Sequence, residues 1–165
     1  MVSNMVTPKV KKVEEKDMGW KQIKLDFKEL KNMGVKVGIM GTEEIDGVAV
    51  VDYATYNELG TRFIPARPFM GTTADRYRDG IYQYTATLVG KMIDGVYDAR
   101  QVLTYIGEWY QAKVQLTIRD AKQWAVPLLP ATIKAKGSSS PLIDTGRMIQ
   151  SVRYEIVGLN EIQPS

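Results

Sequence analysis

The Asp-Thr-Gly motif near the C-terminal end is the sequence feature that most resembles a catalytic site. Residues 142–146 read Leu-Ile-Asp-Thr-Gly, which matches the signature of aspartic proteases, where two such loops meet and two Asp residues share one proton. A homodimeric protease needs only one motif per chain. However, Arg147 follows where a small residue normally lets the two loops approach, and too little chain remains for a β-rich half. We therefore interpret Asp144 or Thr145 as a helix cap and Gly146 as part of a tight turn.

Two further groups of carboxylates could in principle hold a metal ion. The loop from Gly41 to Gly47 carries three acidic residues, but they lack the regular spacing and the terminal Glu of a calcium loop. Asp52 and Glu58 could serve a metal-dependent nuclease, but their spacing gives that function no support. We therefore expect neither a metal site nor a cofactor.

The chain contains no His and no Cys. Their absence removes the commonest general base, the commonest metal ligand, disulfides and thiolate nucleophiles. Chemistry near neutral pH would have to rely on carboxylate, Lys, Tyr or Ser side chains. We therefore expect that the protein has no catalytic residues and is not an enzyme.

Length and composition indicate one soluble domain. The 165 residues are 44% hydrophobic and 25% charged, and no apolar run approaches the ~20 residues that span a bilayer. Residues 1–19 are polar and rich in Lys, without the apolar centre of a signal peptide, so we expect a protein that stays in the cytoplasm where it is made. The net charge of +3 permits contact with nucleic acid without requiring it.

The hydrophobic pattern divides the chain into a flexible N-terminal arm (1–19), one domain (20–157) and an exposed tail (158–165). Apolar residues spaced by three and four predict a helix from Trp20 that ends at Gly34. Alternation predicts one strand over 35–39, another over 48–51 that forms a hairpin with it, and a third over 152–156.

Two long helices follow from the same spacing rule. One is expected to begin with a cap at Thr72 or Thr73 and to run for about five turns, and the other to begin at Asp98 and extend to Trp124. Pro127 then bars helix continuation, and 131–141 reads as a long flexible loop. The predicted fold class is α+β: a small antiparallel or mixed sheet of three to four strands packed by two long helices and an N-terminal helix.

The stretch Tyr53–Phe69 combines a short helix, a Gly stop and two prolines. Pro65 and Pro68 remove two backbone donors and favour extended geometry, which predicts a stiff extended arm. Arg62 and Arg67 flank the apolar side chains of Phe63, Ile64 and Phe69, a mixture that suits docking onto a partner. A plain connection between two elements is the alternative.

A second candidate contact region lies in the loop that carries Lys134 and Lys136. Its basic, Ser-rich character could touch a phosphate backbone, which keeps a nucleic-acid-binding module as an alternative function. A solvated surface loop is the competing interpretation.

Two separated segments together resemble the tail-completion proteins of long-tailed bacteriophages, also called the virion morphogenesis or neck family. The resemblance covers about residues 35–157, with motif order and spacing as in the family. The matching positions are Tyr53-Ala54, Asn57-Glu58, Gly60-Thr61, Ile64-Pro65-Ala66-Arg67-Pro68-Phe69, Ile106-Gly107 and Pro141-Leu142-Ile143-Asp144-Thr145-Gly146 with Ser151.

The resemblance implies a structural virion protein that forms a homo-oligomeric ring, a hexamer, at the head-tail junction. Its implied partners are copies of itself, the tail tube and the connector or stopper, with DNA passing through the lumen without sequence-specific binding. A ring subunit contacts its two neighbours through different patches. The expected interface residues are Tyr53, Asn57, Glu58, Arg62, Phe63, Pro65, Arg67, Pro68 and Phe69, with Arg67 paired to a carboxylate and Phe69 as an apolar anchor. The loop expected near the lumen or a partner ring comprises Lys134, Lys136, Pro141, Leu142, Asp144, Thr145 and Gly146.

Overall fold

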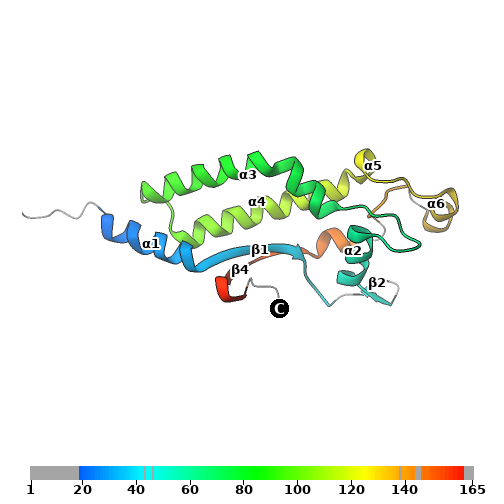
Figure 1. The fold of residues 1–165 in the computed structure, drawn as a ribbon, viewed down its shortest axis with the longest axis horizontal. Helices are drawn as coiled ribbons and strands as arrows, with labels where there is room; N and C mark the ends of the chain where they lie inside the picture. Colours follow the sequence, from blue (N-terminus) through cyan, green and yellow to red (C-terminus); the bar gives the residue numbers. More distant parts are fainter. Residues whose placement is uncertain (1–18, 43, 46, 138, 144–145, 162–165) are drawn as a thin grey trace, which may run out of the picture.

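The computed structural model describes residues 19–42, 44–45, 47–137, 139–143 and 146–161. Figure 1 shows an elongated molecule in which two long antiparallel helices lie along a two-stranded sheet. The predicted α+β class is confirmed. The body of the molecule, meaning α3, α4, β1 and β4, occupies most of its length, while α2 and α6 lie at one end (Figure 1).

The two long helices are α3 (Phe69–Ile93) and α4 (Ala99–Arg119). Asp98 caps α4 as predicted: its side chain accepts the N–H of Gln101, whose side chain in turn accepts the N–H of Asp98. The predicted start of α3 at Thr72 or Thr73 is wrong, because the helix begins at Phe69 directly after Pro68. The α4 helix stops at Arg119, and a separate turn, α5 (Ala121–Trp124), follows it.

The main sheet pairs β1 (Met33–Ile39) with β4 (Val152–Gly158) in antiparallel register, from Met33 opposite Gly158 to Ile39 opposite Val152. One predicted strand pair is therefore wrong, since β1 does not form a hairpin with the apolar run after the acidic loop. Exposed Lys36 and Glu155 lie opposite each other, and Arg153 is also exposed, whereas Val152 is fully buried. The alternation predicted for the last strand is thus present.

The apolar run after the acidic loop is divided between two elements. Strand β3 (Val48–Ala49) pairs with strand β2 (Glu44–Ile45) in a small second sheet. Helix α2 (Val50–Leu59) begins immediately afterwards. The helix buries Val50, Ala54 and Asn57, which are spaced by four and three. The expected strand over 48–51 is confirmed for Val48–Ala49 and wrong for 50–51, where tertiary burial of one helical face outweighs the β propensity of the valines.

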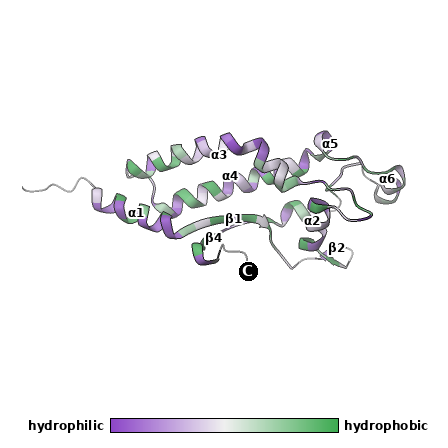
Figure 2. Ribbon diagram, in the orientation of Figure 1, coloured by the Kyte–Doolittle hydropathy of each residue, from purple (hydrophilic) through white to green (hydrophobic). Residues whose placement is uncertain are grey.

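The hydrophobic core lies mainly between α4, the sheet and α2. One cluster includes Val50, Phe69, Val114, Ile118 and Val152. A second cluster, near the C-terminal end of α3, consists of Leu88, Met92, Ala99 and Val102. Hydrophobic residues of β1 and α4 line the middle of the molecule in Figure 2. These clusters hold the long helices on the sheet.

Gly107 lets α4 approach β4 closely. A Cβ built on Gly107 would overlap the ring of Tyr154, which lies in β4. No other residue type could keep this helix-to-strand spacing without moving the ring. The glycine therefore fixes how closely the sheet packs on α4.

The N-terminal helix α1 (Trp20–Asn32) packs less deeply than its sequence pattern predicts. Ile23 and Leu30 are half-buried, but Trp20 and Phe27, expected on the same buried face, are exposed. Asp26 is buried instead and accepts a hydrogen bond from Gln22 Nε2 at 3.1 Å. The helix therefore covers the second core cluster with only part of its apolar surface.

The predicted long loop contains a helix, α6 (Pro130–Lys136). Pro130 takes the first helical position, where no N–H is needed, and Gly137 ends the helix with φ 70°. A short helix, α7 (Arg147–Gln150), precedes β4, and a 3-10 turn, η1 (Leu159–Glu161), follows it. The predicted caps Asp144 and Thr145 and most of the arm (1–18) lie outside the described residues.

None of the described helices combines the length and the apolar character that crossing a bilayer requires.

Candidate functional site

A tight turn follows α2 where an extended arm was predicted. Gly60 ends α2 with φ 76°, and a Cβ there would lie 2.9 Å from the backbone nitrogen of Ala66. Thr61 Oγ1 accepts the N–H groups of Phe63 (3.2 Å) and Ile64 (3.0 Å), and the Thr61 N–H donates to the Ile64 carbonyl at 2.8 Å. The prolines therefore border a hooked turn rather than a straight arm, because Thr61 supplies the hydrogen bonds that close it.

The base of this turn is closed by Asn57 and Arg67. The Arg67 N–H donates to the Asn57 carbonyl at 2.6 Å, and Asn57 Nδ2 donates to the Tyr53 carbonyl at 2.9 Å. Asn57 is only 4% exposed. Its role in the described structure is to hold the turn on α2, so its expected place in an interface does not agree with its burial.

Glu58 caps α3 from the preceding helix. Its Oε2 accepts the N–H of Met70 at 2.9 Å, and its Oε1 accepts the N–H of Gly71 at 3.0 Å. A carboxylate at this position is stabilised by the unpaired N–H groups and the positive end of the helix. This contact explains why α3 begins at Phe69, since both carboxylate oxygens accept N–H groups of its first turn. Asp52 lies exposed in the first turn of α2.

The turn divides its expected interface residues between core and surface. Phe69 is 1% exposed and belongs to the main core, so its predicted role as an anchor for a neighbour is wrong. Phe63 is 87% exposed at the tip of the turn, and the exposed Arg62 places its guanidinium carbon 5.7 Å from the Phe63 ring centroid. Pro68 is the N-cap residue of α3.

Arg67 is a buried cation. Its side chain is 5% exposed, and Nε donates to the carbonyl of Val126 at 2.9 Å. Burial lowers the pKa of the guanidinium, an effect that nearby Tyr53 partly opposes. Among the described residues, no carboxylate forms an ion pair with it, so the expected carboxylate partner is not part of the described chain.

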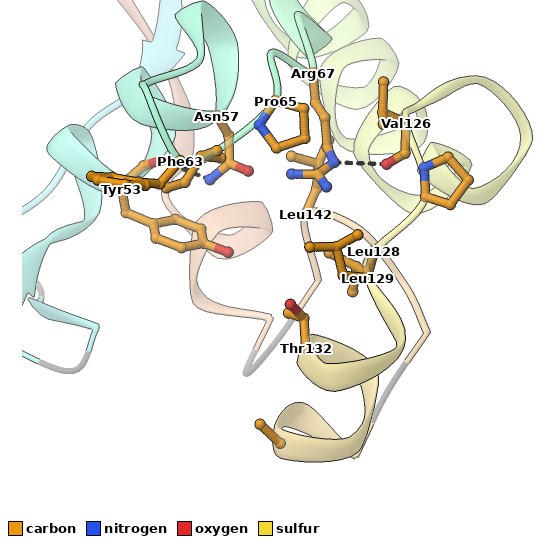
Figure 3. Close-up of a pocket in the computed structure, with 13 residues that line it drawn as sticks. Tyr53, Asn57, Phe63, Pro65, Arg67, Val126, Leu128, Leu129, Thr132 and Leu142 are labelled. Atoms are coloured by element: carbon orange, nitrogen blue, oxygen red, sulfur yellow. Dashed lines mark hydrogen bonds between the residues drawn. The ribbon is translucent and has the colours of Figure 1, made fainter.

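A pocket of about 590 Å³ opens beside Arg67. Figure 3 shows that residues of α2, the turn, the segment around α6 and Leu142 surround it, and that the guanidinium reaches it from the rear. The predicted interface residues on its lining are Tyr53, Asn57, Phe63, Pro65 and Arg67. Leu142, predicted to lie in a separate partner-facing loop, is 3% exposed and lines the same pocket. The two sequence segments that were singled out independently therefore meet here.

Six of the thirteen lining residues were not predicted as site residues: Val126, Pro127, Leu128, Leu129, Thr132 and Ala135. Val126 is 48% and Leu129 is 72% exposed. Figure 2 shows hydrophobic residues in this segment although it lies outside the core. The available signal was an apolar run interrupted by prolines, the same composition that singled out the turn after α2.

The remaining predicted residues are spread around this end of the molecule. Lys134 is exposed on α6, and Lys136 ends that helix. Pro141 is fully buried, and Gly146 is the N-cap residue of α7 with φ 76°. These positions lie on α6, in the connection that follows it and at the start of α7.

The pocket is suited to binding rather than to acid-base chemistry. It presents mainly apolar side chains, the polar groups of Tyr53, Asn57 and Thr132, and one guanidinium, which can donate to an oxygen but cannot exchange its proton near neutral pH. The described residues include no group of three or more His, Cys, Asp or Glu side chains placed to hold a metal ion.

Comparison with known proteins found no family model, no curated protein and no solved structure that matches this chain.

Proposed function

We propose that this chain is a structural, non-catalytic subunit of a phage neck or tail-completion ring that joins the tail tube to the head connector. The observation that carries the proposal is the pocket, where residues from both segments of the family resemblance meet although they are far apart in sequence. One of these segments contributes Tyr53 through Arg67, and the other contributes Leu142. In such a virion protein, segments of this kind serve contacts with neighbouring subunits.

The surface around the pocket supports an interface. Phe63 and Leu129 are 87% and 72% exposed and line the same pocket, which is unusual for two large apolar side chains. Each would lose contact with water when a partner covers it, at roughly 25 cal/mol per Å² of apolar surface buried. Arg62, which lies over Phe63, supplies the charged rim that commonly surrounds such apolar contacts.

A closed ring needs two different surfaces on each subunit, one for each neighbour. In this proposal the pocket end is one of them, and the other lies elsewhere on the elongated molecule. The ring is a hexamer in the virion, its neighbours are the tail tube and the connector or stopper, and DNA passes through the lumen without sequence-specific contacts. Lys134 is available on the surface for such passing contacts.

Electron micrographs of the purified protein, alone and mixed with isolated tails, test the proposal. Rings that attach to one end of the tails are expected. Protein that remains monomeric and never decorates a tail would contradict it. Binding to duplex DNA by the monomer, falling steeply as salt rises, would favour the nucleic-acid-binding alternative instead.

A further inference from the structure

The two outer nitrogens of the Arg67 guanidinium, Nη1 and Nη2, have no hydrogen-bond acceptor among the described residues. Only Nε donates within the described chain, to the carbonyl of Val126. Among the described residues no buried side-chain nitrogen or oxygen lacks a partner, so these two nitrogens are reached through the pocket. In Figure 3 they point into the space beside Leu142 and away from Val126.

A carboxylate is the group that best completes this site. It accepts two parallel hydrogen bonds from a guanidinium and supplies the counter-charge that Arg67 lacks among the described residues. Burial already lowers the pKa of Arg67, which means that the fold holds the charge at a cost. Most of the remaining lining is apolar, with Tyr53, Asn57 and Thr132 as polar exceptions, so a fitting occupant carries apolar side chains next to its carboxylate.

The N-terminal residues of the chain have that composition. Among residues 1–18, side-chain carboxylates occur only at Glu14, Glu15 and Asp17, with Val13 immediately before them and Val10 three residues earlier. An extended segment can enter a pocket of this size, whereas a helix is about 10 Å wide. Carboxylates on the helices of another copy are therefore poorly suited to reach Arg67.

The geometry of one subunit prevents it from filling its own pocket with these carboxylates. Gly19 lies beside Ile93 and Asp94, at the C-terminal end of α3, whereas Arg67 precedes the N-terminal end of the same helix. The 25 residues of α3 span about 37 Å. Glu14 is five residues from Gly19, a reach of at most about 17 Å. Only a second copy, placed head to tail, can bring these carboxylates to the pocket.

We propose that the pocket of each subunit binds the N-terminal segment of the neighbouring copy. A carboxylate of Glu14, Glu15 or Asp17 pairs with Arg67, and Val10 and Val13 contact the apolar lining. This inference rests on the proposed ring, because it names the contact that joins successive subunits.

Disulfide cross-linking between copies tests this contact, because the chain has no Cys of its own. A tagged Val13→Cys chain is mixed with an untagged Leu129→Cys chain, assembled and oxidised. Leu129 is at the pocket rim and 72% exposed. The expected product is a mixed disulfide dimer. The matched control replaces Leu129→Cys by Gln83→Cys, an exposed position on α3, and should give at least about tenfold less product.

Charge variants of the same segment test the pairing with Arg67. Removing all three carboxylates with Glu14→Gln, Glu15→Gln and Asp17→Asn in the Val13→Cys chain should lower the cross-link yield about tenfold, as expected for a charge left without its partner. Removing lysines instead, in a Lys9→Gln, Lys11→Gln, Lys12→Gln chain, changes the same segment without removing a carboxylate. It should leave the yield unchanged.

Three results would overturn the inference. Equal cross-linking at Leu129 and Gln83, in rings that form normally, would show that another surface or another protein fills the pocket while the proposed ring stands. An intramolecular disulfide in a Val13→Cys, Leu129→Cys double variant, kept monomeric by dilution, would show that the chain fills its own pocket. Failure to assemble at any concentration would remove the proposed ring itself, and with it this contact.

Discussion

The body of the molecule and its pocket end treat buried polar groups differently. In the body, Thr73 donates to the carbonyl of Phe69 at 2.7 Å, and Thr117 donates to that of Lys113 at 3.0 Å, so each buried hydroxyl is satisfied within its own helix. At the pocket end, the buried Arg67 has one carbonyl partner and, among the described residues, no counter-charge.

This difference separates stability from recognition. The buried hydroxyls of Thr73 and Thr117 need no partner from outside their own helices. The pocket end leaves the outer nitrogens of Arg67 and two large apolar side chains, those of Phe63 and Leu129, open to solvent. Exposed apolar side chains beside a charge without a counter-charge are typical of a surface that binds a partner.

Substituting Gly107 should have the largest effect on stability. In Gly107→Ala the new Cβ would overlap the Tyr154 ring, so the sheet must move away from α4. We expect the free energy of unfolding to fall by about 2–3 kcal/mol, as for other overpacked core positions. Denaturant unfolding followed by circular dichroism measures it.

Gly90→Ala is the matched control for that substitution. Gly90 also lies in a long helix, but a Cβ there would have no neighbour within 4 Å. Alanine should raise the free energy of unfolding by about 1 kcal/mol through helix propensity. Similar losses at both glycines would contradict the close approach at Tyr154.

Gly60→Ala tests the turn that forms the pocket wall. The substitution combines an unfavourable positive φ with a close contact to the backbone nitrogen of Ala66, and should cost about 2 kcal/mol. Gly95→Ala has a similar φ of 74° but no neighbour within 4 Å, and should cost about 1 kcal/mol. Equal losses in the two variants, measured by thermal unfolding, would mean that the turn is not crowded.

Glu58→Gln tests the contact that links α2 to the start of α3. The amide keeps one acceptor but loses the charge and the second acceptor, so we expect a loss of about 1 kcal/mol. Glu29→Gln, at an exposed position of α1, is the control and should change stability by less than about 0.5 kcal/mol. Equal losses in the free energy of unfolding of Glu58→Gln and Glu29→Gln, unchanged by added salt, would argue against Glu58 as the cap of α3.

The body was largely predictable from sequence because its signals are local and repeated. Apolar residues at helical spacing located α3 and α4, and Asp98 marked the start of α4. Strand β4 followed from alternation. Strand pairing was not predictable in the same way, since β1 pairs with a strand more than a hundred residues away rather than with the nearest apolar run.

The site was predictable only in part. Proline, Gly and the mixture of charged and apolar residues singled out the turn, but not which of its two phenylalanines would be buried. That choice depends on Glu58, which starts α3 early enough to place Phe69 in the core. Likewise, nothing local in sequence connects Arg67 with Val126, because their contact exists only once α4 has folded back.

The most direct measurement of the central claim compares two exposed aromatic residues, one on each part of the molecule. Phe63 lies at the pocket end and is 87% exposed, and Tyr82 lies on α3 and is 70% exposed. Neither Phe63→Ala nor Tyr82→Ala should change the free energy of unfolding by more than about 0.5 kcal/mol. Mass photometry of the assembled protein should show that Phe63→Ala shifts the population from rings to monomers whereas Tyr82→Ala leaves the rings intact. Rings of unchanged mass and yield in Phe63→Ala would contradict the assignment of the pocket end as the surface through which the subunits assemble.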